Sequence, residues 1–386
     1  MGVRLPPGAL SPPRTLVATN DFPPRIGGVE RFLVDLVRAL PAGSVHVLAP
    51  DQPGARAVDR TIEAPVDRLP RARPGGLAPW RRRILDRLDT GGFEVVLIGQ
   101  ALPLGLLVSE LADRGVPCVV LTHGVEYWLA RLPGAAALLR RATEGARLVT
   151  AISTATATAI RSALPADLPV ELLPPGVDVE RFRPDVDASG VRERLGVDAR
   201  PLVLCVSRVV RRKGFDVLVG AMPAILARVP DAVLALVGDG PDRRRIERLA
   251  QRSPARSAIR IVGAVSDVDL PAYHAAADVF AMPARSRWGG LEVEGFGIVY
   301  LEAAASGTPV VAGRSGGAAE AVVHGRTGVL VDGRDPVVVA GAVSGLLVDP
   351  PRRAAMARAA RIHAEAFDRR AIAARLVGYL RTAVGQ

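Results

Sequence analysis

The sequence predicts an α/β protein built from two consecutive doubly wound parallel sheets that face each other across a cleft. Short apolar runs alternate with segments of helical periodicity, and this alternation is typical of βαβ units. The series occurs twice, separated by a segment rich in prolines and charges, residues 171–185. The chain has 386 residues, of which 49% are hydrophobic, so it is long enough to bury two separate cores.

The first series begins with TLVATN, residues 15–20, which we expect to be a buried strand. A turn then leads into VERFLVDLVRAL, whose apolar residues recur at helical spacing and predict a helix with one face on the sheet. These apolar residues are Val29, Phe32, Leu33, Leu36, Val37 and Leu40. Further strands are expected in the runs SVHVLAP, FEVVLIG, CVVLTHG and RLVTAIS, each followed by a polar or glycine-rich loop.

The second series has six strand-like runs, and residues 351–386 predict two helices rich in alanine and arginine. The runs are LVLCVS, AVLALVG, IRIVG, DVFAMP, PVVAG and GVLV. Ligands of doubly wound folds bind beyond the carboxyl ends of the strands. The polar loops that follow these strands are therefore the candidates for function.

The charge of the chain predicts an anionic partner. The formal net charge is +11, which suits nucleic acid, a phospholipid surface or a phosphorylated substrate. Aromatic residues make up only 4% of the chain, so stacking on nucleic acid bases is poorly supported. Of the 50 basic residues one is a lysine, Lys213, and the rest are arginines.

Cysteine content and hydropathy predict a cytoplasmic protein. Cys118 and Cys205 lie in apolar runs and are expected to be buried thiols in a reducing compartment, which disfavours a disulfide framework or zinc site. Residues 1–14 contain prolines where a signal peptide needs an apolar core, and no run reaches the ~20 apolar residues of a membrane span. The segment PWRRRILDRLD, residues 79–89, predicts an amphipathic helix that either lies on an anionic membrane or packs on the first sheet.

Two loops could bind phosphate. Gly27 and Gly28 directly precede a helix, whose free amides and positive end attract anions, although a plain tight turn is the more usual explanation of a lone Gly-Gly pair. Arg208 follows a strand, and Lys213 lies five residues later, just before the next helix. Such a pair suits a diphosphate, because both cations neutralise charge and donate hydrogen bonds. A solvated basic loop is the alternative, but the position of the one lysine indicates that a compact ammonium group is needed here.

Two carboxylates mark the segment SRWGGLEVEGFGIVYLEAAASG. A helix is expected from about Gly297 to a C-cap at Gly307, with Glu294 before it and Glu302 inside it, eight residues on and near the same face. Two carboxylates at this separation could hold a polyhydroxylated ligand, and the free amides of Gly297 and Ile298 add donors. The alternative is that Glu294 only favours the helix dipole and that Glu302 faces solvent.

Histidines and acidic pairs give weaker signals. His123 ends a strand beside Gly124, where it is either structural or faces the cleft. The remaining histidines show no metal-ligand spacing. DVD occurs at residues 185–187 and 267–269, and we interpret both as helix-capping or linker residues in preference to metal ligands.

These motifs together resemble a known family. HGVEYW, PPGVDVERFRP, SRVVRRKGFD, LVGDGP and the spacing of Glu294 and Glu302 are similar to those of retaining GT-B glycosyltransferases of the family 4 type, across nearly the whole chain. SRWGGLEVEGFGIVYLEA and NDFPPRIGGVERF are more similar still to the GDP-mannose-dependent phosphatidyl-myo-inositol (monomannoside) mannosyltransferases. The resemblance implies two Rossmann-like domains, residues 1–183 for the acceptor and 184–367 for the nucleotide sugar. It also implies that a last helix, 368–386, crosses back to the first domain.

The resemblance also implies roles for individual residues. Glu302 should bind ribose hydroxyls and Val265 should meet the base. Glu294 should hold the sugar hydroxyls together with the backbone of residues 296–298. The whole nucleotide-sugar site comprises Gly27, Gly28, Arg208, Lys213, Val265, Glu294, Phe296, Gly297, Ile298 and Glu302, and the catalytic residues are His123, Arg208, Lys213 and Glu294. Asn20, Asp21 and Arg25 are implied acceptor residues.

The activity so implied is transfer of an α-mannose from GDP-mannose to a phosphatidyl-myo-inositol mannoside, as its second mannose in α-1,6 linkage. It would proceed by front-face attack with retention and without metal or other cofactor, at the inner face of the cell membrane. Three alternatives remain: a transferase of the same fold with another nucleotide sugar and acceptor, a non-catalytic sugar-nucleotide or nucleic-acid binding protein, and a GT-B epimerase or phosphorylase. A phosphorylase needs a lysine for its cofactor, and Lys213 already belongs to the phosphate loop.

Overall fold

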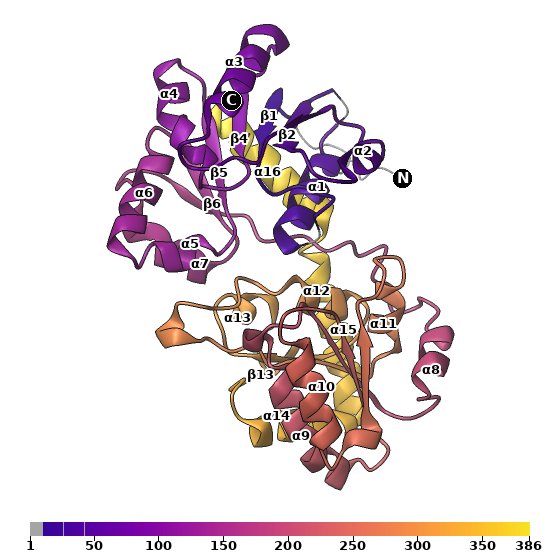
Figure 1. Ribbon diagram of the computed structural model, residues 1–386. Helices are drawn as coiled ribbons and strands as arrows, with labels where there is room; N and C mark the ends of the chain where they lie inside the picture. The colour runs from indigo at the N-terminus through magenta and orange to yellow at the C-terminus, as the bar shows by residue number, and fades with distance from the viewer. Residues whose placement is uncertain (1–10, 26, 42) are drawn as a thin grey trace. The chain divides into compact units, whose positions relative to one another are not determined.

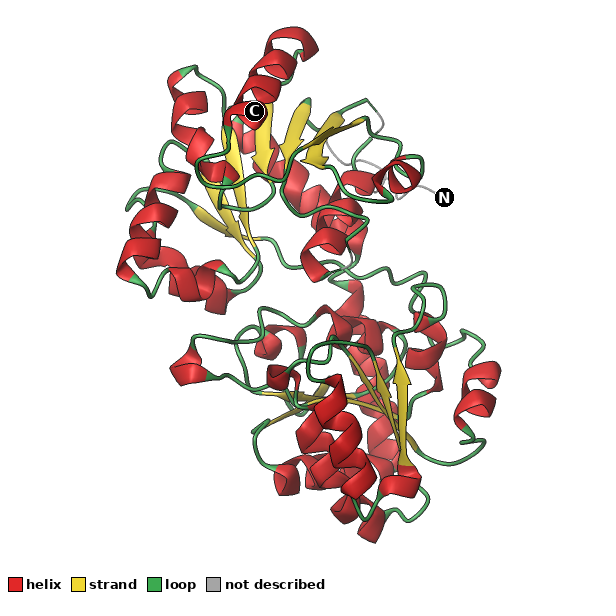
Figure 2. Ribbon diagram, viewed as in Figure 1, coloured by secondary structure: helices red, strands yellow, loops and turns green. Residues whose placement is uncertain are grey.

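The protein forms two compact units, seen in a computed structural model that describes residues 11–25, 27–41 and 43–386. Unit 1 contains the described residues up to Gly176 together with Arg369–Gln386, and unit 2 contains Val177–Asp368. Each unit is a parallel sheet with helices on both faces (Figures 1 and 2). The predicted α/β class with two doubly wound sheets is confirmed. The chain passes between the units at Gly176 and at Asp368, whereas the sequence placed these points at residues 183 and 367.

The described part of unit 1 contains a seven-stranded sheet in the order β3-β2-β1-β4-β5-β6-β7, with every pair parallel. All four residues of β1 are fully buried, because the strand lies in the middle of the sheet between β2 and β4. The strands are β1 (Thr15–Ala18), β2 (Val45–Pro50), β3 (Val66–Leu69), β4 (Val95–Ile98), β5 (Cys118–Thr122), β6 (Leu148–Ala151) and β7 (Val170–Leu172).

The two edge strands of this sheet, β3 and β7, were not predicted from the sequence. β3 reads VDRL and β7 reads VEL, so neither has the apolar run that marks a strand buried on both faces. β7 begins at Val170 and continues into residues 171–172, the start of the stretch that was interpreted as a linker. That interpretation was wrong at its start, since Leu173 and Val177 are buried as well.

Helices cover both faces of the unit 1 sheet. Helix α1 buries Phe32, Leu33, Leu36 and Val37 on the sheet, as its periodicity predicted. The C-terminal helix α16 (Arg369–Ala383) packs on the same core through its apolar residues. Helix α1 spans Gly28–Ala39, and the other helices of unit 1 are α2 (Ala55–Asp59), α3 (Ala78–Gly91), α4 (Val108–Asp113), α5 (Glu126–Leu129), α6 (Pro133–Thr143) and α7 (Thr154–Ile160).

Helix α3 is the segment for which a membrane surface and a packed helix were both open. Its Trp80 and Ile84 are fully buried in the core on the other face of the sheet, and the Trp80 Nε1 donates to the carbonyl oxygen of Pro70 at 2.7 Å. Arg87 forms a forked pair with Asp67, at 2.8 and 2.9 Å. The apolar side of α3 therefore serves the fold and is not available to a bilayer.

The described part of unit 2 contains a six-stranded parallel sheet in the order β10-β9-β8-β11-β12-β13. All six strands were predicted. They are β8 (Leu202–Val206), β9 (Val233–Val237), β10 (Ile259–Gly263), β11 (Val279–Met282), β12 (Val310–Gly313) and β13 (Gly328–Val331). The helices are α8 (Ser189–Leu195), α9 (Phe215–Arg228), α10 (Arg243–Arg252), α11 (Leu270–Ala276), α12 (Ile298–Ala305), α13 (Ala318–Ala321), α14 (Pro336–Leu347) and α15 (Pro350–Glu365). Among the described residues, the protein has no helix with the length and apolarity that crossing a bilayer requires.

Candidate active site

The loops after three strands of unit 2 meet at one edge of its sheet. The loop after β8 contains a single 3₁₀ turn, Arg211–Lys213, before α9 begins. The loop between β11 and α12 carries Glu294, and the loop after β12 carries Ser315. These loops lie together because the strands are parallel and their carboxyl ends share one edge.

Lys213 and Glu294 form a buried ion pair at this edge. The Lys213 Nζ lies 2.7 Å from the Glu294 Oε2, and the two residues are 8% and 5% exposed. The Arg212 guanidinium donates to the same Glu294 oxygen at 2.6 Å. Arg212 also lies 3.8 Å from the Glu292 carboxylate. We call Arg212, Lys213 and Glu294 the cation–carboxylate cluster.

The protein environment lowers the pKa of both members of the buried pair. Burial alone would raise the pKa of Glu294, but Lys213 and Arg212 outweigh it, so the pKa lies below its usual value. Burial lowers the pKa of Lys213, and the Glu294 carboxylate opposes that effect. Glu294 is therefore an anion held between two cations, and its charge is what allows a lysine to be buried here.

Backbone contacts fix the position of Glu294. Its amide donates to the Ser315 Oγ at 3.1 Å, and its carbonyl oxygen accepts from the amide of Gly317 at 2.9 Å. Between these two residues Gly316 has a φ of +50°, and a Cβ there would collide with the Glu294 carbonyl oxygen. The SGG sequence after β12 thus lets the chain turn closely around Glu294.

Substitution of Gly316 by alanine is expected to destabilise unit 2. The left-handed backbone costs an L-residue about 1–2 kcal/mol, and the collision with Glu294 adds to that cost. Urea unfolding measures the loss. Gly190 serves as the control, because a Cβ there meets nothing within 4 Å and its φ is not left-handed. Equal unfolding midpoints for G316A and the wild type would contradict the prediction.

The loop after β8 carries one more functional candidate than the sequence predicted. Arg208 lies in the same loop as Lys213, as predicted, its side chain is exposed, and its implied role at the diphosphate remains a prediction. Arg212 also belongs to this loop and contacts Glu294. Arg212 was not predicted as a site residue, since it lies within the basic run RRK. Its position directly before the lysine was the one available signal.

The second predicted carboxylate, Glu302, lies in a different setting. Glu294 lies in the loop before α12 and Glu302 lies inside the helix, as predicted. Glu302 lies inside α12, is 2% exposed, and its Oε2 is 3.7 Å from the Nε2 of His274 on α11. His274 is fully buried between Phe182 and Phe280 and was not predicted.

The start of α12 matches the prediction closely. Gly297 is its N-cap with a φ of +86°, and Ile298 is its first residue. Phe296 is buried and packs on Phe367 with 5.7 Å between ring centres. Val265 is half-buried in the loop between β10 and α11. The implied contacts of these four residues with a nucleotide sugar remain predictions.

In unit 1, His123 lies at the carboxyl end of β5. Its Nε2 is 2.6 Å from the carbonyl oxygen of Gly99, which follows β4, and its ring packs edge-on against Phe32 at 5.6 Å between centres. Its amide donates to the Glu126 carboxylate at 3.0 Å. The ring is thus fixed at the edge of the sheet where doubly wound folds bind ligands. Its implied catalytic role remains a prediction.

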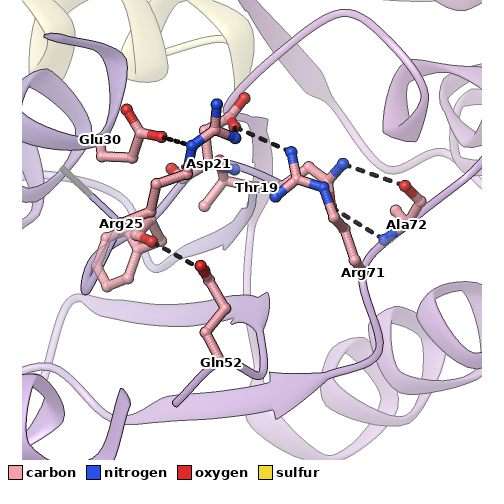
Figure 3. Close-up of polar contacts among 9 residues, drawn as sticks. Thr19, Asp21, Arg25, Glu30, Gln52, Arg71 and Ala72 are labelled. Atoms are coloured by element: carbon pink, nitrogen blue, oxygen red, sulfur yellow. Dashed lines mark hydrogen bonds and ion pairs between the residues drawn. The ribbon is translucent and has the colours of Figure 1, made fainter. Parts of the chain in front are cut away.

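The predicted acceptor residues lie in a polar cluster after β1 (Figure 3). Arg25 connects two buried acids, lying 3.4 Å from Asp21 and 3.1 Å from Glu30. Arg71, which was not predicted, lies 3.4 Å from the same Asp21 oxygen as Arg25. The side-chain amide of Asn20 bonds the backbone of residue 72 in both directions, at 2.9 and 3.1 Å, so Asn20 holds this loop in place, and its implied role at the acceptor remains a prediction.

The glycines before α1 contact this cluster. Gly27 is the N-cap of α1 in extended conformation, and Gly28 begins the helix. The Glu30 carboxylate lies against Gly27, so the first turn of the helix already carries a negative charge of its own.

The two DVD motifs make local hydrogen bonds: the Asp187 carboxylate accepts from the Ser189 amide, and Asp269 bonds Ser266. No group of metal-ligating side chains occurs among the described residues.

Family profiles match both units of the chain. The family described as "Glycosyltransferase Family 4" matches residues 26–181, and "Glycosyl transferases group 1" matches residues 191–363. The chain is 43% identical over 380 residues, 95% of this chain and 98% of the other, to the GDP-mannose-dependent alpha-(1-6)-phosphatidylinositol monomannoside mannosyltransferase of Mycobacterium tuberculosis (strain CDC 1551 / Oshkosh). It is 41% identical over 359 residues, 92% and 93% of the two chains, to the GDP-mannose-dependent monoacylated alpha-(1-6)-phosphatidylinositol monomannoside mannosyltransferase of Corynebacterium glutamicum.

Solved structures support the same fold. Anabaena Alr3699/HepE in complex with UDP superposes with a TM-score of 0.81, at 23% identity and with 96% of this chain and all of the other covered. Sucrose-phosphate synthase from Thermosynechococcus elongatus superposes with a TM-score of 0.77, also at 23% identity, covering 96% and 98% of the two chains. These structural similarities establish the fold. They do not identify the substrates, which have to be inferred from the chain's own residues and from relatives of higher sequence identity.

Proposed function

Because this chain belongs to the family of GT-B glycosyltransferases that includes the phosphatidylinositol monomannoside mannosyltransferases, and so is a hexosyltransferase, we propose that it transfers mannose from GDP-mannose to a phosphatidyl-myo-inositol mannoside. The mannose would be the second on that lipid, in α-1,6 linkage. The names of relatives that are 41–44% identical over at least 90% of this chain support both donor and acceptor.

The cation–carboxylate cluster is the observation that carries this proposal. It places two cations and one carboxylate in a space where the carboxylate is 5% exposed. A nucleoside diphosphate sugar presents matching groups, since its diphosphate attracts Lys213 and Arg212 while the hydroxyls of its sugar donate to Glu294. On donor binding, Lys213 and Arg212 would exchange part of their contacts with Glu294 for contacts with the diphosphate.

The proposed reaction breaks the bond between the anomeric carbon and the β-phosphate oxygen. The electron pair of that bond stays on the diphosphate, where the two cations stabilise it, and positive charge develops on the sugar. The acceptor hydroxyl oxygen forms the new bond on the face from which the phosphate departs, and its proton goes to a phosphate oxygen, so the configuration is retained. Glu294 is a poor covalent nucleophile because two cations already hold it.

Two further features belong to the proposal. The charge of the leaving group is met by side-chain cations, so we propose that no divalent metal is required. A phospholipid acceptor would be met at a membrane surface, and we place that encounter at the inner face of the cell membrane. Turnover that persists in excess chelator is the expected result for the first feature.

A transfer assay tests the proposal. Purified protein is incubated with radiolabelled GDP-mannose, UDP-glucose or UDP-N-acetylglucosamine, each with phosphatidylinositol monomannoside, and the lipid is then extracted. We expect label in the lipid from GDP-mannose alone, released by an α-1,6-mannosidase. Label from a UDP-sugar only would reject the mannosyl assignment, and a linkage of β configuration would reject retention.

A further inference from the structure

A basic hollow lies beside an exposed tryptophan in unit 2. It has a volume of about 440 Å³ and is lined by Arg285, Ser286, Arg287, Trp288 and Arg334. The proposed donor contacts do not use any of these five side chains. The hollow is near the cation–carboxylate cluster, because the Arg285 amide donates to the Arg212 carbonyl oxygen at 2.8 Å.

Trp288 is exposed to solvent and has an unfavourable, left-handed backbone conformation. It is 69% exposed and has a φ of +50°, and the next two residues, Gly289 and Gly290, have φ values of +62° and +88°. A left-handed conformation is costly for a residue with a large side chain, and such outliers cluster at functional positions. Leu291, at the end of the same turn, is 37% exposed. The turn therefore presents an aromatic and an aliphatic side chain to solvent.

The charges around the hollow are only partly balanced. Arg285 bonds Asp216 at 2.8 Å and Arg287 bonds Glu292 at 2.9 Å. Arg334 donates to the carbonyl oxygen of Ser286 at 2.6 Å, and within the described ranges no carboxylate lies at ion-pair distance from it. The Arg287 guanidinium carbon is 4.5 Å from the centre of the Trp288 ring. The hollow is thus lined by the guanidinium of Arg334, whose charge is not balanced by a nearby carboxylate in the described ranges, and by the indole of Trp288.

We propose that this hollow binds the phosphate of an anionic glycerophospholipid, with Trp288 and Leu291 resting at the boundary between headgroups and acyl chains. An indole favours that boundary because its ring is apolar and its N–H is polar. Arginine beside it suits a phosphodiester, which accepts several hydrogen bonds. The inference adds to the proposed function a lipid contact on unit 2. It rests on that function only in taking a membrane as the place of reaction.

Tryptophan emission tests the contact directly. The chain has three tryptophans, of which Trp80 is fully buried, so a W128F background leaves Trp288 as the exposed reporter. We expect its emission to shift to shorter wavelength with vesicles that contain phosphatidylinositol, to stay unchanged with phosphatidylcholine alone, and to recover in high salt. An equal shift on both vesicles, or none on either, would overturn the proposal. So would a shift produced by soluble inositol phosphate or by a uridine oligonucleotide without vesicles.

Vesicle sedimentation with matched variants separates a site from general charge. R334Q is expected to weaken partitioning to the anionic vesicles about fivefold, the usual contribution of one arginine near such a surface. R248Q removes the same charge from the exposed face of α10 and is expected to change partitioning less. W288A should weaken partitioning as well, whereas W128A, on unit 1, should not. Equal losses in R334Q and R248Q would overturn the proposal.

Transfer onto detergent-dispersed acceptor is measured with the same preparations. Wild-type protein that binds vesicles but transfers no mannose would refute the proposed function and leave the lipid contact intact. Wild-type protein that transfers mannose while W288A and R334Q partition normally would refute the lipid contact and leave the function intact. The two failures are therefore distinguishable.

Discussion

Replacing Lys213 by methionine is expected to lower kcat/KM for mannosyl transfer by about 10²–10³-fold while unit 2 stays folded. The ammonium group would be lost from the place where the proposed leaving group gathers charge. Methionine fills a similar volume and carries no charge, so the cost of burying a cation disappears. Glu294 keeps its contact with Arg212 at 2.6 Å and is not left alone in the interior. Initial rates with radiolabelled GDP-mannose give the ratio.

Two companion variants show whether the loss comes from Lys213 itself. K213R keeps the charge but not the compact ammonium, and we expect it to recover only part of the activity, since the space around the 8%-exposed lysine is filled. R248Q removes a charge from the exposed surface of α10 and should leave the rate unchanged. A K213M rate within a few-fold of the wild type would mean that the cluster does not stabilise the leaving group.

The two sheets were predictable to the extent that their strands are apolar. The five central strands of unit 1 and the four central strands of unit 2 are apolar runs that are buried on both faces, and such runs are visible in a single sequence. The edge strands of unit 2, β10 and β13, are partly exposed but still mostly apolar, so they were visible too. β3 and β7 lie at the edges of the unit 1 sheet and carry Asp67, Arg68 and Glu171. Their pairing depends on the neighbouring strand and not on their own composition, so the sequence pattern does not reveal them.

The principal residues of the candidate site were predictable from the sequence, but the contacts between them were not. Lys213 and Glu294 stood out by residue type and by their places in loops, and the structure brings them to 2.7 Å. Arg212 could not be singled out in the basic run, because only the folded 3₁₀ turn decides that Arg212, and not Arg211, joins Lys213 at Glu294. His274 and Glu302 meet only because α11 packs beside α12, and no spacing along the chain encodes that contact.

Replacing Glu294 by glutamine is expected to destabilise unit 2 by about 3–5 kcal/mol at neutral pH, besides abolishing the proposed grip on the sugar hydroxyls. The amide removes the charge that offsets Lys213 and Arg212, so an ammonium group and a guanidinium group are left facing each other with the lysine buried. Chemical unfolding by urea measures the difference. E63Q, at an exposed position of unit 1, controls for the general effect of losing one carboxylate.

The cost of E294Q should fall as the solution becomes acidic. The folded-state pKa of Glu294 lies below its usual value, about 4.5, so its charge stabilises the folded protein fully above that pH. The contribution is lost as the pH falls through the lower folded pKa, because the wild-type carboxyl then becomes neutral like the amide. The difference in unfolding free energy between wild type and E294Q should therefore be constant near neutrality and shrink below about pH 4. A difference that stays constant into this acidic range would show that Glu294 stabilises unit 2 by its shape and hydrogen bonds and not by its charge.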